Sequence, residues 1–108
     1  MTMEELENQF KLLVGGYFGV LELDNYDLKV YILKDIEEYI RNFIMVNPIP
    51  HYNYKEKALE YKDSLVLKTK VQDALIVLHK IEAPMEVVLL MKAKLKKIEQ
   101  EEKRQREL

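Results

Sequence analysis

The chain has 108 residues, 48% of them hydrophobic, with three glycines, three prolines and no cysteine. This length predicts one domain that buries a core of its own, and the lack of cysteine excludes disulfides and thiolate metal sites. The formal net charge of −2 argues against a polyanionic partner for the chain as a whole.

Two further classes of protein are disfavoured by the distribution of apolar residues. No apolar run approaches the ~18 residues that a transmembrane helix needs. The acidic start, MTMEELENQ, has no apolar core and does not resemble a signal peptide. We therefore expect a soluble cytoplasmic protein with no membrane partner.

The first predicted helix begins with a capping box, because Glu5 follows Thr2 by three residues. Apolar residues then recur at helical spacing at Met3, Leu6, Phe10 and Leu13. Gly15-Gly16 is expected to end this helix, since glycine readily adopts the left-handed conformation found at helix ends. The following stretch, YFGVLELDN, is interpreted as a buried connector and not as a strand, because no partner strand is evident.

The clearest helical pattern lies in LKVYILKDIEEYIRNFIMV. Its apolar stripe, spaced for one helix face, consists of Ile32, Ile36, Tyr39, Ile40 and Phe43. Asp24, Asn25 or Asp27 can cap its start. Asn47-Pro48 is expected to end it, because a residue before proline is disfavoured in the helical region. The segment NPIPHYN is interpreted as a stiff linker. Asn53 and Glu56 are three residues apart and loosely repeat the capping-box spacing of the first helix.

A change of phase marks the next helical stretch. Ala58, Tyr61 and Leu65 share one helix face, whereas the residues that follow define another: Leu67, Val71, Ala74, Leu75, Leu78 and Ile81. Thr69 with Gln72 matches a capping box. These patterns predict a break between Ser64 and Thr69, with one long bent helix as the alternative.

The last helix is expected to begin at Pro84, which suits the first helical position. It carries a packing seam at Met85, Val88, Met91, Leu95 and Ile98. The prediction for the fold is an all-α bundle of four to five helices with a long charged C-terminal helix. Residues 1–91 would form the bundle, and residues 92–108 would be a charged helical extension of the same domain.

The C-terminal helix has more apolar surface than a small body can cover. From Lys92 to Leu108 the chain has seven Lys/Arg and four Asp/Glu, a net +3, which leaves −5 for the remainder. Just before this segment, residues 87–91 are apolar on nearly every side, and such a helix is usually buried on every side. We therefore expect the helix to bind a protein partner or a second copy, giving a homo-oligomer. The predicted partner-binding residues are Val87, Leu90, Met91, Lys94, Leu95, Lys97 and Ile98.

The sequence predicts no catalytic, cofactor or metal site. The only histidines, His51 and His79, lack a second ligand at helical spacing. Ser64 is the only serine and does not lie in a nucleophile turn. GGYFG resembles a phosphate loop only superficially, because it follows a helix and lacks the lysine of a P-loop. We therefore expect a protein that is not an enzyme.

Nucleic-acid binding is a less favoured alternative, supported by aromatic and basic residues that interleave after the linker. Aromatic rings can stack on bases while lysines contact phosphates. The residues that would do so are Tyr52, Tyr54, Lys55, Lys57, Tyr61 and Lys62. The competing interpretation is that these tyrosines cover the edge of the bundle.

Residues 5–50 resemble the small head–tail connector proteins of tailed bacteriophages. The resemblance rests on FKLLVGG, on DNYDLKVYILKDIEEYIRNFI and on NPIP. It implies a helical, non-enzymatic subunit of the virion that assembles as a ring and grips a neighbouring component with its C-terminal helix. The second half departs from this pattern, because its third helix is more charged and the segment after Glu82 is shorter. A small phage-type or mobile-element-type regulator that binds and inhibits a host protein is the alternative.

Overall fold

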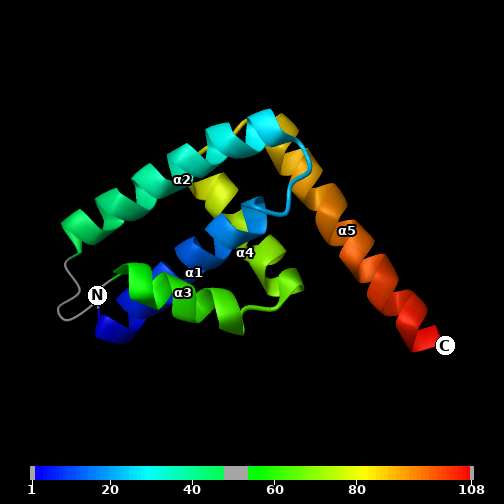
Figure 1. The fold of residues 1–108 in the computed structure, drawn as a ribbon, viewed down its shortest axis with the longest axis horizontal. Helices are drawn as coiled ribbons and strands as arrows, with labels where there is room; N and C mark the ends of the chain where they lie inside the picture. The colour runs from blue at the N-terminus through cyan, green and yellow to red at the C-terminus, as the bar shows by residue number, and fades with distance from the viewer. Residues whose placement is uncertain (1, 48–53, 108) are drawn as a thin grey trace.

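The computed structural model describes residues 2–47 and 54–107, which form five α-helices and no strand. The helices are α1 (Met3–Val20), α2 (Tyr26–Val46), α3 (Tyr54–Ser64), α4 (Leu67–Lys80) and α5 (Met85–Glu107) (Figure 1). The predicted all-α class is confirmed. Among the described helices, none is both long enough and apolar enough to cross a membrane.

Helix α1 is central to the bundle. It contacts α2, α3 and α4, and α5 packs on α4 (Figure 1). Apart from Leu23 in the turn before α2, the described apolar side chains that are buried lie on α1, α2, α4 and α5: Phe10, Leu13, Val14, Val20, Leu23, Ile32, Ile36, Ile40, Val71, Ala74, Val77, Leu78, Val87 and Met91. Helix α3 covers the core with half-buried side chains such as Ala58 and Tyr61. The chain thus has one continuous core built around its first helix.

The glycines lie inside α1 and not at its end, so the predicted end at Gly15-Gly16 is wrong. Gly16 and Gly19 are buried where α1 crosses α4. A Cβ on Gly19 would lie 2.7 Å from the carbonyl carbon of Lys70, and one on Gly16 would lie 2.9 Å from Cβ of Val77. A glycine inside a helix costs about 1 kcal/mol relative to alanine. The close approach of the two helices outweighs that cost, and this tertiary contact could not be seen in the local pattern.

The predicted Thr2 cap of α1 is confirmed, and of the three candidates for α2, which were Asp24, Asn25 and Asp27, Asn25 is the cap. The Thr2 hydroxyl accepts a hydrogen bond from the Glu5 amide (3.2 Å), and the Asn25 side chain accepts one from the Leu28 amide (3.1 Å). The predicted connector YFGVLELDN is only partly correct, because residues 17–20 belong to α1 and only residues 21–25 form the turn, which buries Leu23. Helix α2 buries Ile32, Ile36 and Ile40 of the predicted stripe and ends at Val46. The predicted linker after Asn47 and the predicted cap at Asn53 lie outside the described residues.

The predicted break between α3 and α4 is confirmed, and the single bent helix is wrong. Helix α3 ends at Ser64, and α4 begins at Leu67. The predicted capping box at Thr69 is also wrong, because Val66 occupies the N-cap position and makes no side-chain cap bond. The helix therefore starts two residues before Thr69. The change in the apolar stripe gave the position of the break more reliably than the capping motif did.

A left-handed residue, Glu82, ends α4 and turns the chain into α5. It has a φ of 54° and is the only described non-glycine residue with a positive φ. The Ala83 amide donates to the Leu78 carbonyl (2.9 Å), and the Glu82 amide donates to the His79 carbonyl (3.2 Å). This pair of bonds is a Schellman motif, which satisfies the last carbonyls of a helix. It directs α5 back along α4.

Candidate interaction surface

The exposed side of α5 begins with apolar side chains that are largely open to solvent in the described part of the chain. Met85 is 66% exposed, Leu89 57% and Leu90 38%. Ala93 is also exposed, and the spacing of four residues from Met85 to Leu89 to Ala93 places them along one side of the helix. We call Met85, Leu89, Leu90 and Ala93 the α5 outer face. It is a short apolar strip next to the charged end of the same helix.

Two of the predicted partner-binding residues face the opposite way. Val87 and Met91 are completely buried in the chain's own core, so their assignment to a partner surface is wrong. The predicted apolar stripe of α5 starts at Met85 and Val88, and a second apolar stripe starts at Val87. Both stripes include Met91, Leu95 and Ile98. The seam expected from the sequence starts at Met85, but the helix is rotated so that Val87 enters the core.

The other predicted residues lie at the border between core and solvent. Leu95 and Ile98 are half-buried and pack against the core. Leu90, Lys94 and Lys97 line a shallow groove of about 130 Å³ between α5 and the turn that joins α1 to α2. Glu22 and Asp24 lie on the turn side of this groove, opposite the lysines. Acidic and basic groups therefore line opposite walls where the first half of α5 meets the body.

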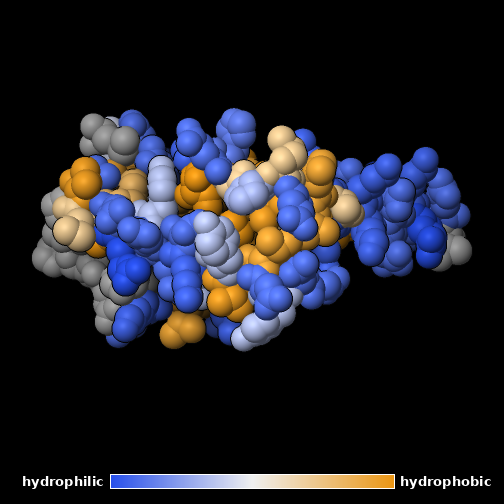
Figure 2. All heavy atoms as spheres, turned by 90° about the horizontal axis from the view of Figure 1, so that it is seen from above, coloured by the Kyte–Doolittle hydropathy of each residue, from blue (hydrophilic) through white to orange (hydrophobic). Residues whose placement is uncertain are grey.

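The second half of α5 leaves the body as a charged helix. It projects from the bundle, and its end is covered by hydrophilic side chains, whereas hydrophobic side chains gather on the body beside it (Figures 1 and 2). The Lys68 ammonium contacts a carboxylate oxygen of Glu102 at 2.9 Å, which links the start of α4 to this segment. Arg104 and Glu101 are 3.8 Å apart on the helix surface. The helix continues to Glu107, beyond its last core residue, Ile98.

The structure does not form an aromatic stacking platform from the predicted nucleic-acid residues that it describes. Tyr61 packs on Phe10 with ring centroids 6.0 Å apart, and burial raises the pKa of its phenol. Lys57 lies 5.7 Å above the Tyr61 ring and 3.3 Å from Glu60. Lys55 lines a cleft and Lys62 is exposed. Tyr52 and the side chain of Tyr54 lie outside the described part of the chain.

The described part of the chain holds no cluster of metal ligands. No group of three or more His, Cys, Asp or Glu side chains is placed to share an ion there. His79 is exposed at the end of α4, and His51 lies outside the described residues. The Ser64 hydroxyl donates to the Tyr61 carbonyl (3.1 Å), so this hydroxyl closes the last turn of α3.

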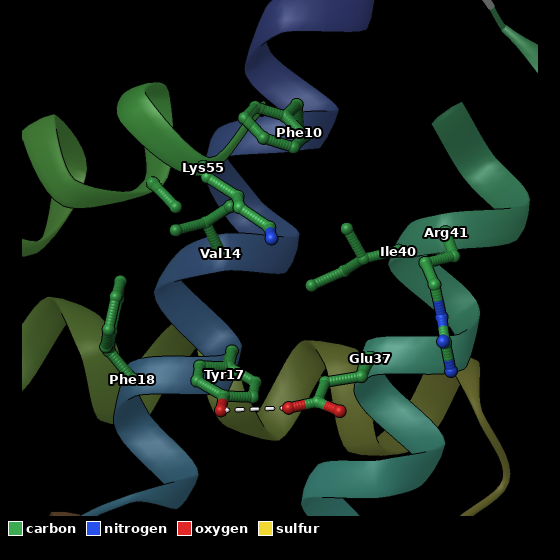
Figure 3. A pocket seen from close by; sticks show the side chains of 9 residues that line it. Phe10, Val14, Tyr17, Phe18, Glu37, Ile40, Arg41 and Lys55 are labelled. Carbon is green, nitrogen blue, oxygen red and sulfur yellow. Dashed lines mark hydrogen bonds between the residues drawn. The ribbon is translucent and has the colours of Figure 1, made fainter. Parts of the chain in front are cut away.

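A second concave feature, which the sequence pattern did not predict, lies between α1, α2 and α3. This cleft has a volume of about 330 Å³. Its apolar lining consists of Phe10, Val14, Phe18, Ile40 and Ala58, and its polar lining consists of Tyr17, Glu37, Arg41 and Lys55 (Figure 3). No local sequence motif indicates this cleft, because its nine described lining residues come from three helices and span nearly fifty positions.

A hydrogen bond joins α1 to α2 at one end of the cleft. The Tyr17 hydroxyl donates to a carboxylate oxygen of Glu37 at 3.1 Å (Figure 3). Burial and the neighbouring carboxylate both raise the pKa of Tyr17, so the phenol stays protonated and keeps its donor role at neutral pH. The ring of Tyr17 packs edge-on against Phe18 with centroids 5.6 Å apart. The wall formed by these two aromatic residues is thus fixed in orientation.

Comparisons with protein-family models, with curated proteins and with solved structures found no match to this chain.

Proposed function

We propose that this protein is a non-enzymatic assembly or interaction protein that binds a protein partner through α5. The observation that carries the proposal is the α5 outer face, where Met85 and Leu89 expose more than half of their side chains beside a completely buried core. Single exposed apolar residues are common, but contiguous ones next to a polar border are typical of interaction sites.

The charged end of α5 supports the same proposal. A helix gains most of its stability in a protein from packing an apolar face, yet this helix extends to Glu107 after its last core residue at Ile98. Lys96 and Lys97 are exposed just beyond the outer face, and Lys92 is exposed beside it. Apolar anchors with a charged border are the usual anatomy of a protein–protein interface.

The resemblance of residues 5–50 to phage head–tail connectors favours a connector subunit as the most specific form of this proposal. The protein would then assemble as a homo-oligomer in the virion and contact a neighbouring component through α5. A regulator that inhibits a host protein would use the same surface with a different partner. Nucleic-acid binding has less support, because Tyr61 packs on Phe10 instead of presenting its ring.

Site-specific photo-crosslinking tests the proposal. A photoreactive residue replaces Leu89, and the matched control carries it at Leu59, which is 60% exposed on α3 compared with 57% for Leu89. Both variants are expressed at natural level in the cells of origin and irradiated. We expect a discrete covalent adduct from position 89 that position 59 does not give.

The mass of the adduct separates the forms of the proposal. An adduct of twice the chain mass indicates self-assembly, and one of another mass identifies a foreign partner. Equal labelling from both positions, or no discrete adduct from position 89, would contradict an interaction role for α5.

A further inference from the structure

The exposed side of α5 carries opposite charges at its two ends. Glu86 precedes the apolar residue Leu89, and Lys96 follows Ala93. These four residues are all exposed, and they follow one another at intervals of three, four and three residues. This is the spacing of a coiled-coil seam, which keeps its members in one row along a helix. We call these four residues the outer row, and its order is acidic, apolar, apolar and basic.

The outer row lies opposite the side of α5 that packs on the chain's own core. Val87 and Met91 are completely buried, and Leu95 and Ile98 pack against the same core. With 3.6 residues per turn, these four residues centre on one side of the helix and the outer row centres on the other. Helix α5 therefore has an inner seam that the chain itself covers and an outer seam that faces solvent.

The charges at the ends of the outer row are available to another molecule. Neither Glu86 nor Lys96 forms an ion pair within the described part of the chain. Between them, Leu89 exposes 57% of its surface. A partner that matches this row must present a basic group, an apolar middle and an acidic group, in the reverse direction.

A second copy of α5 presents that reverse order when it runs antiparallel. Around a two-fold axis level with residue 91, Glu86 of one copy faces Lys96 of the other, and the symmetry makes this pair twice. Leu89 and Ala93 face each other in the same register, because both are two residues from the axis. A parallel copy would instead place each charged residue against its own equivalent, and like charges repel. The order of the charges therefore favours the antiparallel arrangement.

The middle of the outer row suits close packing between two helices. The small Ala93 of one copy leaves room for Leu89 of the other, as a hole receives a knob in a coiled coil. Leu90 is 38% exposed beside the axis and would add apolar contact. Residues 86–96 extend over about 15 Å of helix, which is short for a stable interface, so we expect a dimer that dissociates on dilution.

We propose that the α5 outer face binds a second copy of this chain as an antiparallel, two-fold pair, with Glu86 of each copy against Lys96 of the other. This inference rests on the proposed role of α5 in binding a protein and names the partner. A two-fold contact of this kind closes at two copies, so a larger ring would have to use other surfaces.

Sedimentation equilibrium of the full chain and its charge-reversal variants tests the proposal. We expect the parent to dimerise reversibly. Glu86→Lys and Lys96→Glu should each weaken the dimer at least tenfold, because either change brings like charges together in both symmetry-related pairs. The matched control is Glu38→Lys, which makes the same change of charge at an exposed position of α2 and should leave the dimer unchanged.

Mixing the two variants tests the register of the helices. An equimolar mixture of Glu86→Lys and Lys96→Glu should recover the affinity of the parent, because both pairs between the unlike chains then join opposite charges. The double variant, which carries both changes in one chain, should recover it for the same reason. Recovery in either case also requires that the altered chains fold.

Three results would overturn the proposal. Single variants that dimerise as well as the parent would remove the role of the charges, and failure of both the mixture and the double variant to recover would exclude the antiparallel register. A parent that stays monomeric would exclude self-pairing. If position 89 then crosslinked to a protein of another mass, the interaction role of α5 would stand and only its pairing with a second copy would fall.

Discussion

The carboxylate of Asp73 on α4 lies directly over Gly15 on α1, in the space that a Cβ at position 15 would occupy. Gly15, Gly16 and Gly19 all face α4, but their neighbours differ. The neighbour of Gly15 is the end of a side chain that can rotate, whereas the neighbour of Gly19 is the backbone of Lys70. The three glycines are therefore not equivalent, although the sequence shows them as one motif.

We expect Gly19→Ala to destabilise the protein and Gly15→Ala to be nearly neutral. A methyl at position 19 must push α1 and α4 apart, and such overpacking costs ~1–3 kcal/mol. At position 15, rotation of Asp73 relieves the contact with its carboxylate, but its Cβ stays 3.3 Å away. The cost of that tight contact offsets the gain of about 1 kcal/mol in helix propensity that alanine brings. Urea unfolding of the two variants measures the difference. Equal destabilisation would show that side-chain and backbone neighbours at this crossing are equally rigid.

Asp73 should make stability depend on pH. Burial raises the pKa of its carboxyl to about 6, an effect that Lys11 partly offsets. Because this folded-state pKa lies above the ordinary value of 3.8, the folded protein binds the proton more tightly than the unfolded chain. The contribution of Asp73 to stability is therefore full below about pH 4 and is lost as the pH rises through 6.

Asp73→Asn should remove this dependence. We expect the variant to be more stable than the parent by ~1 kcal/mol at pH 7.5 and equal to it at pH 4, where the figure allows for partial exposure of the carboxyl. Thermal unfolding at both pH values measures it. Asp63→Asn is the matched control, because it makes the same chemical change at an exposed position of α3. A constant offset for Asp73→Asn would contradict a titrating carboxyl.

Glu82 is strained, and glycine should relieve that strain. Its φ of 54° is the left-handed conformation, which glycine adopts at no steric cost. We expect Glu82→Gly to raise the free energy of unfolding by ~0.5–1 kcal/mol, because the Schellman bonds would remain. Glu82→Ala tests whether the gain comes from the backbone, since alanine removes the charge and keeps the Cβ. A similar gain in both variants would point to charge instead.

The two sides of α5 should respond differently to truncation. Met91→Ala removes a completely buried side chain and should cost ~2–5 kcal/mol. Leu89→Ala changes a side chain that is 57% exposed and should cost less than ~0.5 kcal/mol. Chemical denaturation measures both values. A large loss for Leu89→Ala would mean that its side is already covered in solution.

The ion pair between Lys68 and Glu102 should order the end of α5 without adding much global stability. Partly exposed pairs contribute ~0–1 kcal/mol. We expect Lys68→Ala to leave the melting temperature within about 2 °C and to speed amide hydrogen exchange after Ile98. The control is Arg104→Ala, which breaks only a contact within the helix. Equal exchange in both variants would show that the pair does not order the helix end.

Local signals predicted the features that depend on neighbouring residues. The Asn25 cap, the end of α2 before Asn47 and the stripe of Ile32, Ile36 and Ile40 all follow from short-range chemistry. The features that depend on distant residues were missed or misassigned. The position of the glycines inside α1 is explained only by their contacts with Lys70 and Val77 on α4. The rotation of α5 depends on which of its two overlapping apolar stripes packs against the core.

The cleft could not be predicted for a related reason. Phe10, Ile40 and Ala58 are ordinary apolar residues of three separate helices, and only the packing of α2 and α3 on α1 brings them around one space. The α5 outer face was partly predicted, because an excess of apolar residues there was visible in the sequence. The identity of the exposed members was not, since it depends on the rotation of the helix.

Gly19 on α1 packs against the backbone of Lys70 on α4, and this contact affects how the chain folds during synthesis. A contact across roughly fifty residues is non-local for a helical bundle of this size, and such contacts slow folding because a long loop must close first. As the chain leaves the ribosome, α1 has no partner for its glycine face until α4 has emerged. The chain should therefore collapse late in translation, and a stalled product that ends before α4 should remain exposed to proteases.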